Sequence, residues 1–185
     1  MGNIILIVLV VLVALLVYAA TRPNSFRVRR SARIGAPPEK VFPLINDFHQ
    51  WTSWSPWERL DPNLQRTYSG ADAGKGAVYE WRGNNKVGAG RMEIVDSFDP
   101  SKILIQLDFL KPFKASNRTE FTLETEGGST DVHWEMYGAS PFMAKLMGIF
   151  MSMDKMVGRD FERGLASMKA VAEGNAPATV PPPRT

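Results

Sequence analysis

The chain has 185 residues, 44% of them hydrophobic and 22% charged, with a formal net charge of +3 at pH 7. This is the composition of an ordinary globular domain, and so mild a charge does not indicate a nucleic-acid-binding protein. The chain contains no cysteine, which excludes disulfides, thiol nucleophiles and cysteine-ligated metals. It also shows no internal repeat, which argues against a solenoid or a propeller.

The first segment differs in character from the rest of the chain. Residues 4–20, IILIVLVVLVALLVYAA, carry no charge. At ~1.5 Å per residue they come close to the length needed to span a ~30 Å hydrocarbon core. We expect residues 1–21 to form a single-pass membrane anchor. A cleaved signal peptide is the alternative, with Val17-Tyr18-Ala19 before the cut, although no Lys or Arg opens the segment.

Basic residues follow this segment and bear on its orientation. The arginines are Arg22, Arg27, Arg29, Arg30 and Arg33. The positive-inside rule then places the following domain in the cytoplasm. The same arginines could contact anionic headgroups, or could simply form the solvated face of a strand.

The residues after the anchor predict a strand and then a helix. Residues 26–35, FRVRRSARIG, alternate apolar and basic side chains, as a strand with one solvated face does. In APPEKVFPLINDF, the pair Pro37-Pro38 suits a helix entrance, and apolar residues from Val41 to Phe48 give the helix an apolar side.

Residues 63–138 lose the helical period and predict strands separated by turns. The runs are GAVYEWRG, VGAGRMEIVDSF, KILIQLDFL, RTEFTLETE and TDVHWEMYG. Each alternates, so that Tyr79 and Trp81, for example, share one face. Hairpin-joined strands with one apolar face predict an antiparallel sheet with one buried side.

Residues 141–173 restore the helical period, with an apolar stripe from Phe142 to Met168. The stretch predicts one helix of ~45–50 Å, long enough to cross the sheet. The fold class is therefore α+β, a bent antiparallel sheet wrapped around a long C-terminal helix.

The same stretch is rich in methionine, with six of the nine in the chain. Flexible thioether side chains suit either gap-filling in a core or a surface that repacks around varied apolar ligands. Met143, Met147 and Met151 lie off the main stripe, where they could face the membrane or a second protein.

The order of elements, with these residues, resembles the START/polyketide-cyclase superfamily, known as SRPBCC, and its helix-grip fold. The similar segments are APPEKVFPLINDFHQWTSWSPWE, GKGAVYEWRGN, VGAGRMEI, DVHWEMYG and MVGRDFERGLASMKAVAE. The resemblance covers residues 26–173 and rests on packing and turn motifs, not on catalytic ones. It implies a cavity for hydrophobic ligands between the sheet and the terminal helix.

Three of the five tryptophans, Trp51, Trp54 and Trp57, recur at a spacing of three beside Pro56. In the resembled fold this segment lies near one end of the grip. The indoles could plug that end of the core, with their N–H groups bonded to backbone carbonyls, or could line the cavity. The predicted ligand-binding residues are Trp54, Trp57, Tyr79, Trp81, Met92, Leu107, Phe109, Phe121, Trp134, Met136, Phe150, Met153 and Val157.

No constellation of catalytic residues emerges. The only histidines, His49 and His133, are far apart, and no carboxylate forms a ligand-spaced cluster with them. Asp160 and Glu162, between Arg159 and Arg163, have the pattern of a solvated helix flank. We predict no catalytic residue, no metal and no cofactor.

Three functions remain open. The first is membrane-anchored binding or transport of a hydrophobic small molecule or lipid, which burial of apolar ligand surface would stabilise. The second is an enzyme of the cyclase/dehydratase kind, and the third is an adaptor that binds protein. The domain organisation is an anchor or signal segment over 1–21, the helix-grip domain over 22–173, and a Pro-rich tail over 174–185 that is expected to be disordered. The sequence indicates a membrane partner through residues 4–20, no nucleic acid, and no particular protein partner.

Overall fold

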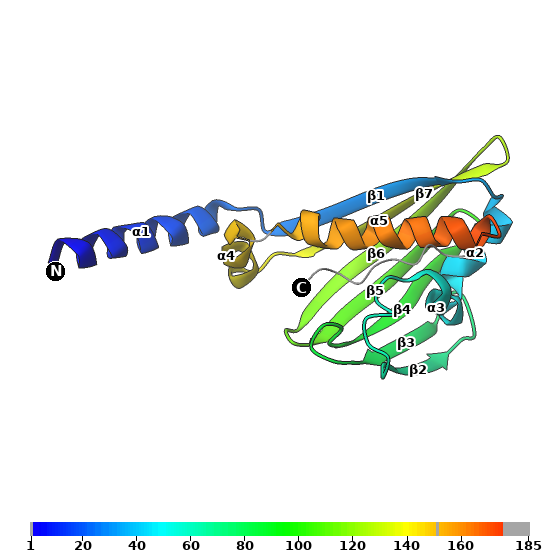
Figure 1. Ribbon diagram of the computed structural model, residues 1–185, viewed down its shortest axis with the longest axis horizontal. Helices are drawn as coiled ribbons and strands as arrows, with labels where there is room; N and C mark the ends of the chain where they lie inside the picture. Colours follow the sequence, from blue (N-terminus) through cyan, green and yellow to red (C-terminus); the bar gives the residue numbers. More distant parts are fainter. Residues whose placement is uncertain (1, 151, 176–185) are drawn as a thin grey trace.

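A computed structural model describes residues 2–150 and 152–175. Seven antiparallel strands form one sheet in the order β1-β7-β6-β5-β4-β3-β2. The sheet curves around the C-terminal helix, and a separate helix extends from the domain at the N-terminus (Figure 1). The elements are α1 (Gly2–Thr21), β1 (Ser25–Ile34), α2 (Pro38–Asn46), η1 (Phe48–Gln50), α3 (Trp51–Trp54), β2 (Gln65–Gly70), β3 (Ala77–Arg82), β4 (Ala89–Phe98), β5 (Lys102–Lys111), β6 (Ala115–Glu126), β7 (Ser129–Ala139), α4 (Phe142–Phe150) and α5 (Met153–Ala172).

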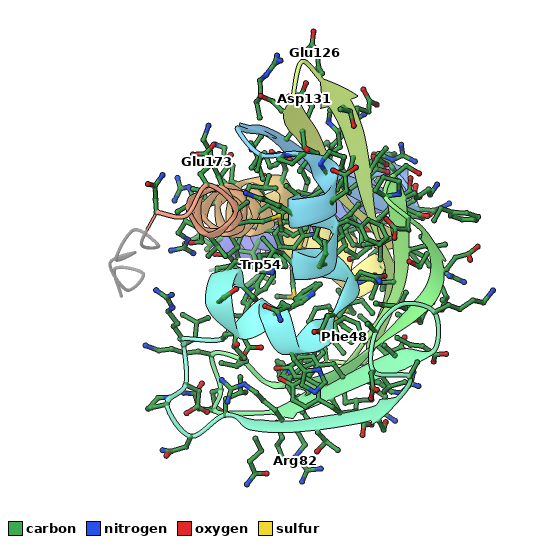
Figure 2. All side chains as sticks on the ribbon, turned by 90° about the vertical axis from the view of Figure 1, so that its right-hand side faces the viewer. Phe48, Trp54, Arg82, Glu126, Asp131 and Glu173 are labelled. Carbon is green, nitrogen blue, oxygen red and sulfur yellow. The ribbon has the colours of Figure 1, made fainter. Side chains whose placement is uncertain are left out.

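The predicted α+β fold and antiparallel sheet are confirmed. The first strand, β1, forms one edge of the sheet and pairs with β7, from Ser25 opposite Ala139 to Ile34 opposite Thr130. The inward residues of the strands are the predicted apolar ones, and they meet α2, α3 and α5 in a single core. Figure 2 shows Phe48 and Trp54 pointing into this core and Arg82 pointing away from it.

One strand, β2, was not predicted from the sequence. Its residues, QRTYSG, are exposed except for the half-buried Tyr68. Without a buried face, β2 lacks the alternation of apolar residues that marks the other strands. It forms because its backbone pairs with the edge of β3, from Gln65 opposite Arg82 to Gly70 opposite Ala77.

The prediction of one continuous helix over 141–173 is wrong. The stretch forms two helices, α4 and α5, and only α5 crosses the sheet. Ser152 caps the start of α5, where its hydroxyl accepts a hydrogen bond from the Lys155 amide at 3.3 Å. Serine is a favoured N-cap residue, so a new helix can begin here. The apolar residues on either side keep the same spacing, which is why the sequence pattern did not reveal the break. Its 20 residues make α5 ~30 Å long, shorter than predicted.

The helix α4 lies apart from the core, beside the C-terminal end of α1 (Figure 1). Lys145 on α4 donates a hydrogen bond to the Asn24 side chain at 2.5 Å, and the Ser140 amide donates to the Asn24 carbonyl at 2.7 Å. These bonds hold α4 against the segment that joins α1 to the sheet. Within the described residues, α1 is the one helix long and apolar enough to cross a membrane, a property that signal sequences share.

The arginines that follow α1 divide between two faces of β1. Arg27 and Arg33 form ion pairs with Glu135 and Glu126 on the outer face. Arg30 instead points toward α5, where its Nε lies 2.7 Å from Glu162 and its Nη1 lies 2.9 Å from Asp154. These hydrogen bonds lower the pKa of Asp154 and raise that of Arg30. Glu162 thus links α5 to β1 through an ion pair. Its sequence pattern is that of a solvated helix flank and did not indicate this role.

Two glycines let α5 approach the sheet closely. A Cβ on Gly158 would lie 2.0 Å from Nη2 of Arg30. A Cβ on Gly164 would lie 2.8 Å from Cζ3 of Trp134 and 3.1 Å from Cδ of Pro56. The helix therefore rests directly on the indole of Trp134, which is buried.

Replacing Gly164 by alanine should destabilise the fold. Trp134 is packed on every side and cannot yield to the new methyl group, so we expect Gly164→Ala to lower the free energy of unfolding by about 1–3 kcal/mol. The control is Gly148→Ala on α4, where nothing lies within 4 Å and the better helix propensity of alanine should raise stability by up to ~1 kcal/mol. Denaturant unfolding of the full chain in detergent, followed by tryptophan fluorescence, measures both; equal effects would contradict the close approach.

Candidate functional site: an apolar cavity between sheet and helix

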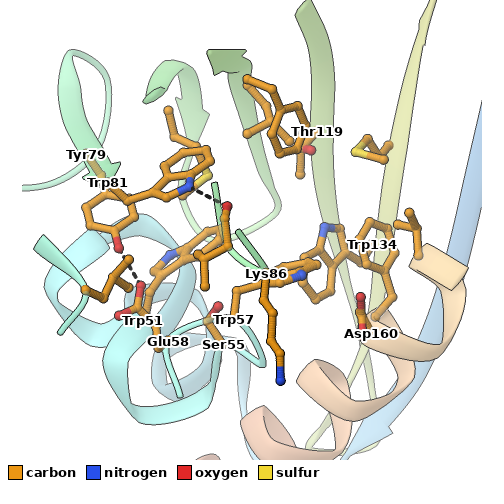
Figure 3. A pocket seen from close by; sticks show the side chains of 18 of the residues that line it. Trp51, Ser55, Trp57, Glu58, Tyr79, Trp81, Lys86, Thr119, Trp134 and Asp160 are labelled. Carbon is orange, nitrogen blue, oxygen red and sulfur yellow. Dashed lines mark hydrogen bonds between the residues drawn. The ribbon is translucent and has the colours of Figure 1, made fainter. Parts of the chain in front are cut away.

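A cavity of about 300 Å³ lies between the concave face of the sheet and α5. Strands β3 to β7 supply one wall, α5 supplies the opposite wall, and α3 with the loop after it closes one end (Figure 3). Most of its lining is aromatic or aliphatic. The inward faces of the strands come to the cavity because each strand alternates, so that every second side chain points toward α5.

Most of the predicted ligand-binding residues line this cavity. They are Trp57, Tyr79, Trp81, Met92, Leu107, Phe109, Trp134, Met136 and Val157. Strand alternation brought the β3 to β7 members together, and Trp57 and Val157 enter from the loop after α3 and from α5.

Three of the other four predicted residues, Trp54, Phe121 and Met153, do not line the cavity. Trp54 and Phe121 are fully buried in the core. Met153 is the first residue of α5 and is 40% exposed. Phe150 belongs to α4 and not to the helix that crosses the sheet, and its side chain lies outside the described residues.

The three clustered tryptophans have different places. The indole N–H of Trp51 donates to the Ile45 carbonyl at 3.0 Å, and that of Trp54 donates to the Leu44 carbonyl at 2.7 Å. Both bonds fasten α3 to α2. Trp51 and Trp57 also line the cavity, and Trp57 packs edge-on against Trp134, with ring centroids 5.7 Å apart.

A polar cluster forms one side of the cavity wall. The carboxylate of Glu58 is buried and accepts a hydrogen bond from the Tyr79 hydroxyl at 2.6 Å (Figure 3). It accepts a second one from Nε of Arg66, also at 2.6 Å. Burial, and then the bond to Glu58, raises the pKa of Tyr79 far above the ordinary tyrosine value. The bond to Glu58 likewise raises the pKa of Arg66. Sequence analysis missed Glu58 because it lies in an irregular loop, where no period assigns it a face.

Trp81 lines the cavity, and the position of its ring depends on Gly90. Its indole crosses the neighbouring strand at Gly90, where a Cβ would lie 2.4 Å from the ring. The indole N–H donates to the Val87 carbonyl at 3.2 Å. The missing side chain of Gly90 thus leaves room for the Trp81 ring beside β4.

The exposed part of the lining defines the mouth. Lys86, in the loop between β3 and β4, and Met156, in the first turns of α5, are the exposed lining residues in the described part of the chain. Asp160, predicted to be on a solvated flank, is half-buried at the cavity and contacts Arg163. Among residues 2–150 and 152–175, no group of three His, Asp or Glu side chains could hold a metal ion.

The helix-grip class of proteins is defined by a curved antiparallel sheet that wraps around a C-terminal helix, with an apolar cavity between the two. Residues 25–173 match the family described as polyketide cyclase / dehydrase and lipid transport. The chain belongs to this family, which is of the SRPBCC type. No curated protein sequence matches it significantly.

Solved structures share the fold at low sequence identity. Protein CV1439 from Chromobacterium violaceum is 16% identical, with a TM-score of 0.57, over 82% of this chain and 99% of that one. The Aha1 dimer from Colwellia psychrerythraea is 15% identical, with a TM-score of 0.54, over 84% of this chain and 99% of that one. The di-domain ARO/CYC protein BexL, from the BE-7585A biosynthetic pathway, is 16% identical, with a TM-score of 0.59, over 89% of this chain and 53% of BexL. At such identities the likeness extends to the fold alone.

Removing the Tyr79 hydroxyl tests the polar cluster. Tyr79→Phe leaves one oxygen of the buried Glu58 without its donor, so we expect the free energy of unfolding at neutral pH to fall by about 1–3 kcal/mol. The raised pKa adds a pH dependence: folded Tyr79 keeps its proton at a pH where the unfolded chain has lost it. Wild-type stability should therefore decline above pH ~10, and the decline should be shallower in Tyr79→Phe.

Denaturant unfolding at several pH values measures both effects. Tyr137→Phe, on the outer face of β7, is the matched control for loss of a phenol. An alkaline decline that is equally steep in wild type and Tyr79→Phe would contradict the assignment.

Proposed function

We propose that this protein binds or carries one hydrophobic small molecule or lipid in the cavity, while α1 anchors it in a membrane. The cavity itself is the observation that carries the proposal. Its aromatic and aliphatic walls would bury the ligand's apolar surface, at ~25 cal/mol per Å², and this burial would supply most of the affinity. The family description, which includes lipid transport, is consistent with such a role.

The volume limits the kind of ligand. About 300 Å³ is at the lower end of the ~300–1,000 Å³ range of small-molecule sites. This size favours a compact ring system or a single short acyl chain over a two-chain lipid. The stacked aromatic walls favour a planar ring system further, because ring faces and edges can pack against it.

A cyclase or dehydratase activity is the second candidate, and one observation favours it. The Glu58 carboxylate and the Tyr79 hydroxyl both line the cavity, where they could exchange a proton with a bound polyketide. The Glu58 oxygens are already engaged by Tyr79 and Arg66, however, and this arrangement suits a structural tie better than a general base. Binding therefore ranks first.

A cavity-filling variant tests the binding proposal. Val157 is half-buried on α5 and lines the cavity, so Val157→Trp should fill it and exclude the ligand. Arg159→Trp, on an exposed position two residues away, adds the same indole outside the cavity. We expect organic extracts of protein purified from its native cells to contain a defined apolar molecule for wild type and Arg159→Trp, at several-fold lower abundance for Val157→Trp.

Mass spectrometry identifies the molecule, and a fluorescent probe gives a second readout. N-phenyl-1-naphthylamine should brighten with wild type and Arg159→Trp but not with Val157→Trp. Extracts that match bulk membrane lipid in all three proteins, together with equal probe fluorescence, would rule out carriage in this cavity.

The anchor makes a separate prediction. The full chain should remain with membranes after an alkaline carbonate wash, because α1 presents an apolar surface long enough to span the bilayer. A chain that begins at Arg22 should be released. Intact-mass measurement of the membrane-bound protein distinguishes a retained anchor from a signal peptide, since cleavage near Ala19 would remove α1. A protein found released and shortened would contradict anchoring.

A further inference from the structure

The end of the sheet nearest α1 carries exposed apolar side chains from two separate parts of the chain. On α4, Phe142, Met143 and Met147 are exposed, Met143 to 64%. Leu110, near the end of β5, and Phe113, in the turn that follows it, are also exposed, Phe113 to 73%. Several exposed apolar side chains gathered at one end of a domain, unlike single scattered ones, are a feature of surfaces that contact something apolar.

Strand pairing places these segments at one end of the domain. The sequence after α1 enters β1 at Ser25, which lies opposite Ala139 at the end of β7, just before α4. The β6 residue Asn117 pairs with Gly138 near that same end of β7. Lys111, at the end of β5, pairs with Ala89, which follows the loop 83–88. We call the segments 83–88, 110–114 and 142–150 the α1-proximal end.

The opposite end of the sheet has a different character. There the turn between β6 and β7 carries Glu126, Gly127 and Gly128, and Glu126 pairs with Arg33. Figure 2 shows Glu126 and Asp131 pointing out from this hairpin. Charged and small residues at this turn suit water. Among the described residues of the domain, Phe98 at the end of β4 is the one large apolar side chain exposed at this opposite end, at 55%, so the exposed apolar side chains are concentrated at the α1-proximal end.

We propose that the α1-proximal end is a second membrane-contact surface, on which α4 and the Leu110–Phe113 turn insert shallowly into the bilayer that α1 spans. This inference rests on the proposed anchoring by α1. Continuity supports it, because α4 lies beside the last turns of α1 (Figure 1). Charge supports it too, because the exposed Lys86, Lys111 and Lys114 flank the apolar residues and would meet anionic headgroups.

The surface would place the cavity mouth at the membrane. Lys86 lies in the loop 83–88, and Met156 follows α4 in the first turns of α5. A ligand dissolved in the bilayer would then reach the cavity without crossing bulk water. The exposed methionines of α4 would present a deformable apolar surface beside that path.

The absence of cysteine from the sequence allows a direct depth measurement on the full chain. Single-cysteine variants Phe113→Cys and Met147→Cys, labelled with the fluorophore NBD, report on the proposed contacts. Glu126→Cys at the opposite end is the matched control, and Val13→Cys in the middle of α1 reports on the anchor. The proteins are reconstituted in phosphatidylcholine–phosphatidylglycerol vesicles that contain lipids with a nitroxide quencher, either near the glycerol or near the end of the acyl chain.

We expect NBD at positions 113 and 147 to be quenched strongly by the shallow nitroxide, as for insertion of ~5–10 Å, and weakly by the deep one. NBD at position 13 should show the reverse order, and NBD at position 126 should be quenched by neither. Deep quenching at 13 without quenching at 113 and 147 would overturn the second contact and leave the anchor intact. No quenching at position 13 would overturn both the anchor and this inference.

Discussion

The packing of α5 on Trp134 is the contact on which the rest of the fold depends. The Trp134 ring stacks on Phe161 with centroids 3.9 Å apart and planes 7° from parallel, and Gly164 allows the helix to come this close. Trp54, Trp57 and Phe121 pack around the same indole. A curved sheet with one apolar face must bury that face against another element, and this aromatic cluster determines where α5 packs on it.

The cavity is a consequence of where that cluster stops. Beside Trp134 the core is filled by interlocking rings, but toward β3 and β4 the curved sheet diverges from α5. There the Trp81 ring occupies the space that Gly90 leaves free, and Glu58 is hydrogen-bonded by Tyr79 and Arg66. The hydrogen bonds and ring contacts of these side chains hold them at the edge of the space and oppose its collapse.

The proposed binding role and the proposed membrane contact complement each other physically. An apolar ligand is scarce in water and concentrated in a bilayer, so a carrier gains from a mouth that faces the lipid. The ion pairs of Arg30 with Asp154 and Glu162 hold the start of α5 against β1 beside that mouth. With α4 and α5 as separate helices, α4 would be able to follow the membrane surface while α5 stays on the sheet.

Alternation and helical period in the sequence determined the sheet, the core face of each strand and the apolar N-terminal helix, because these patterns follow directly from local backbone geometry. Most of the cavity wall followed from the same alternation together with the family resemblance. Only the tertiary structure decided the rest. Trp54 and Phe121 belong to the core and not to the cavity wall because of how α3 packs, and Glu58 reaches the cavity from an irregular loop. The strand β2 forms because β3 offers a free edge. The terminal helix divides at Ser152 because α4 and α5 contact different parts of the protein. Each depends on contacts between residues far apart in the chain, which local periodicity does not encode.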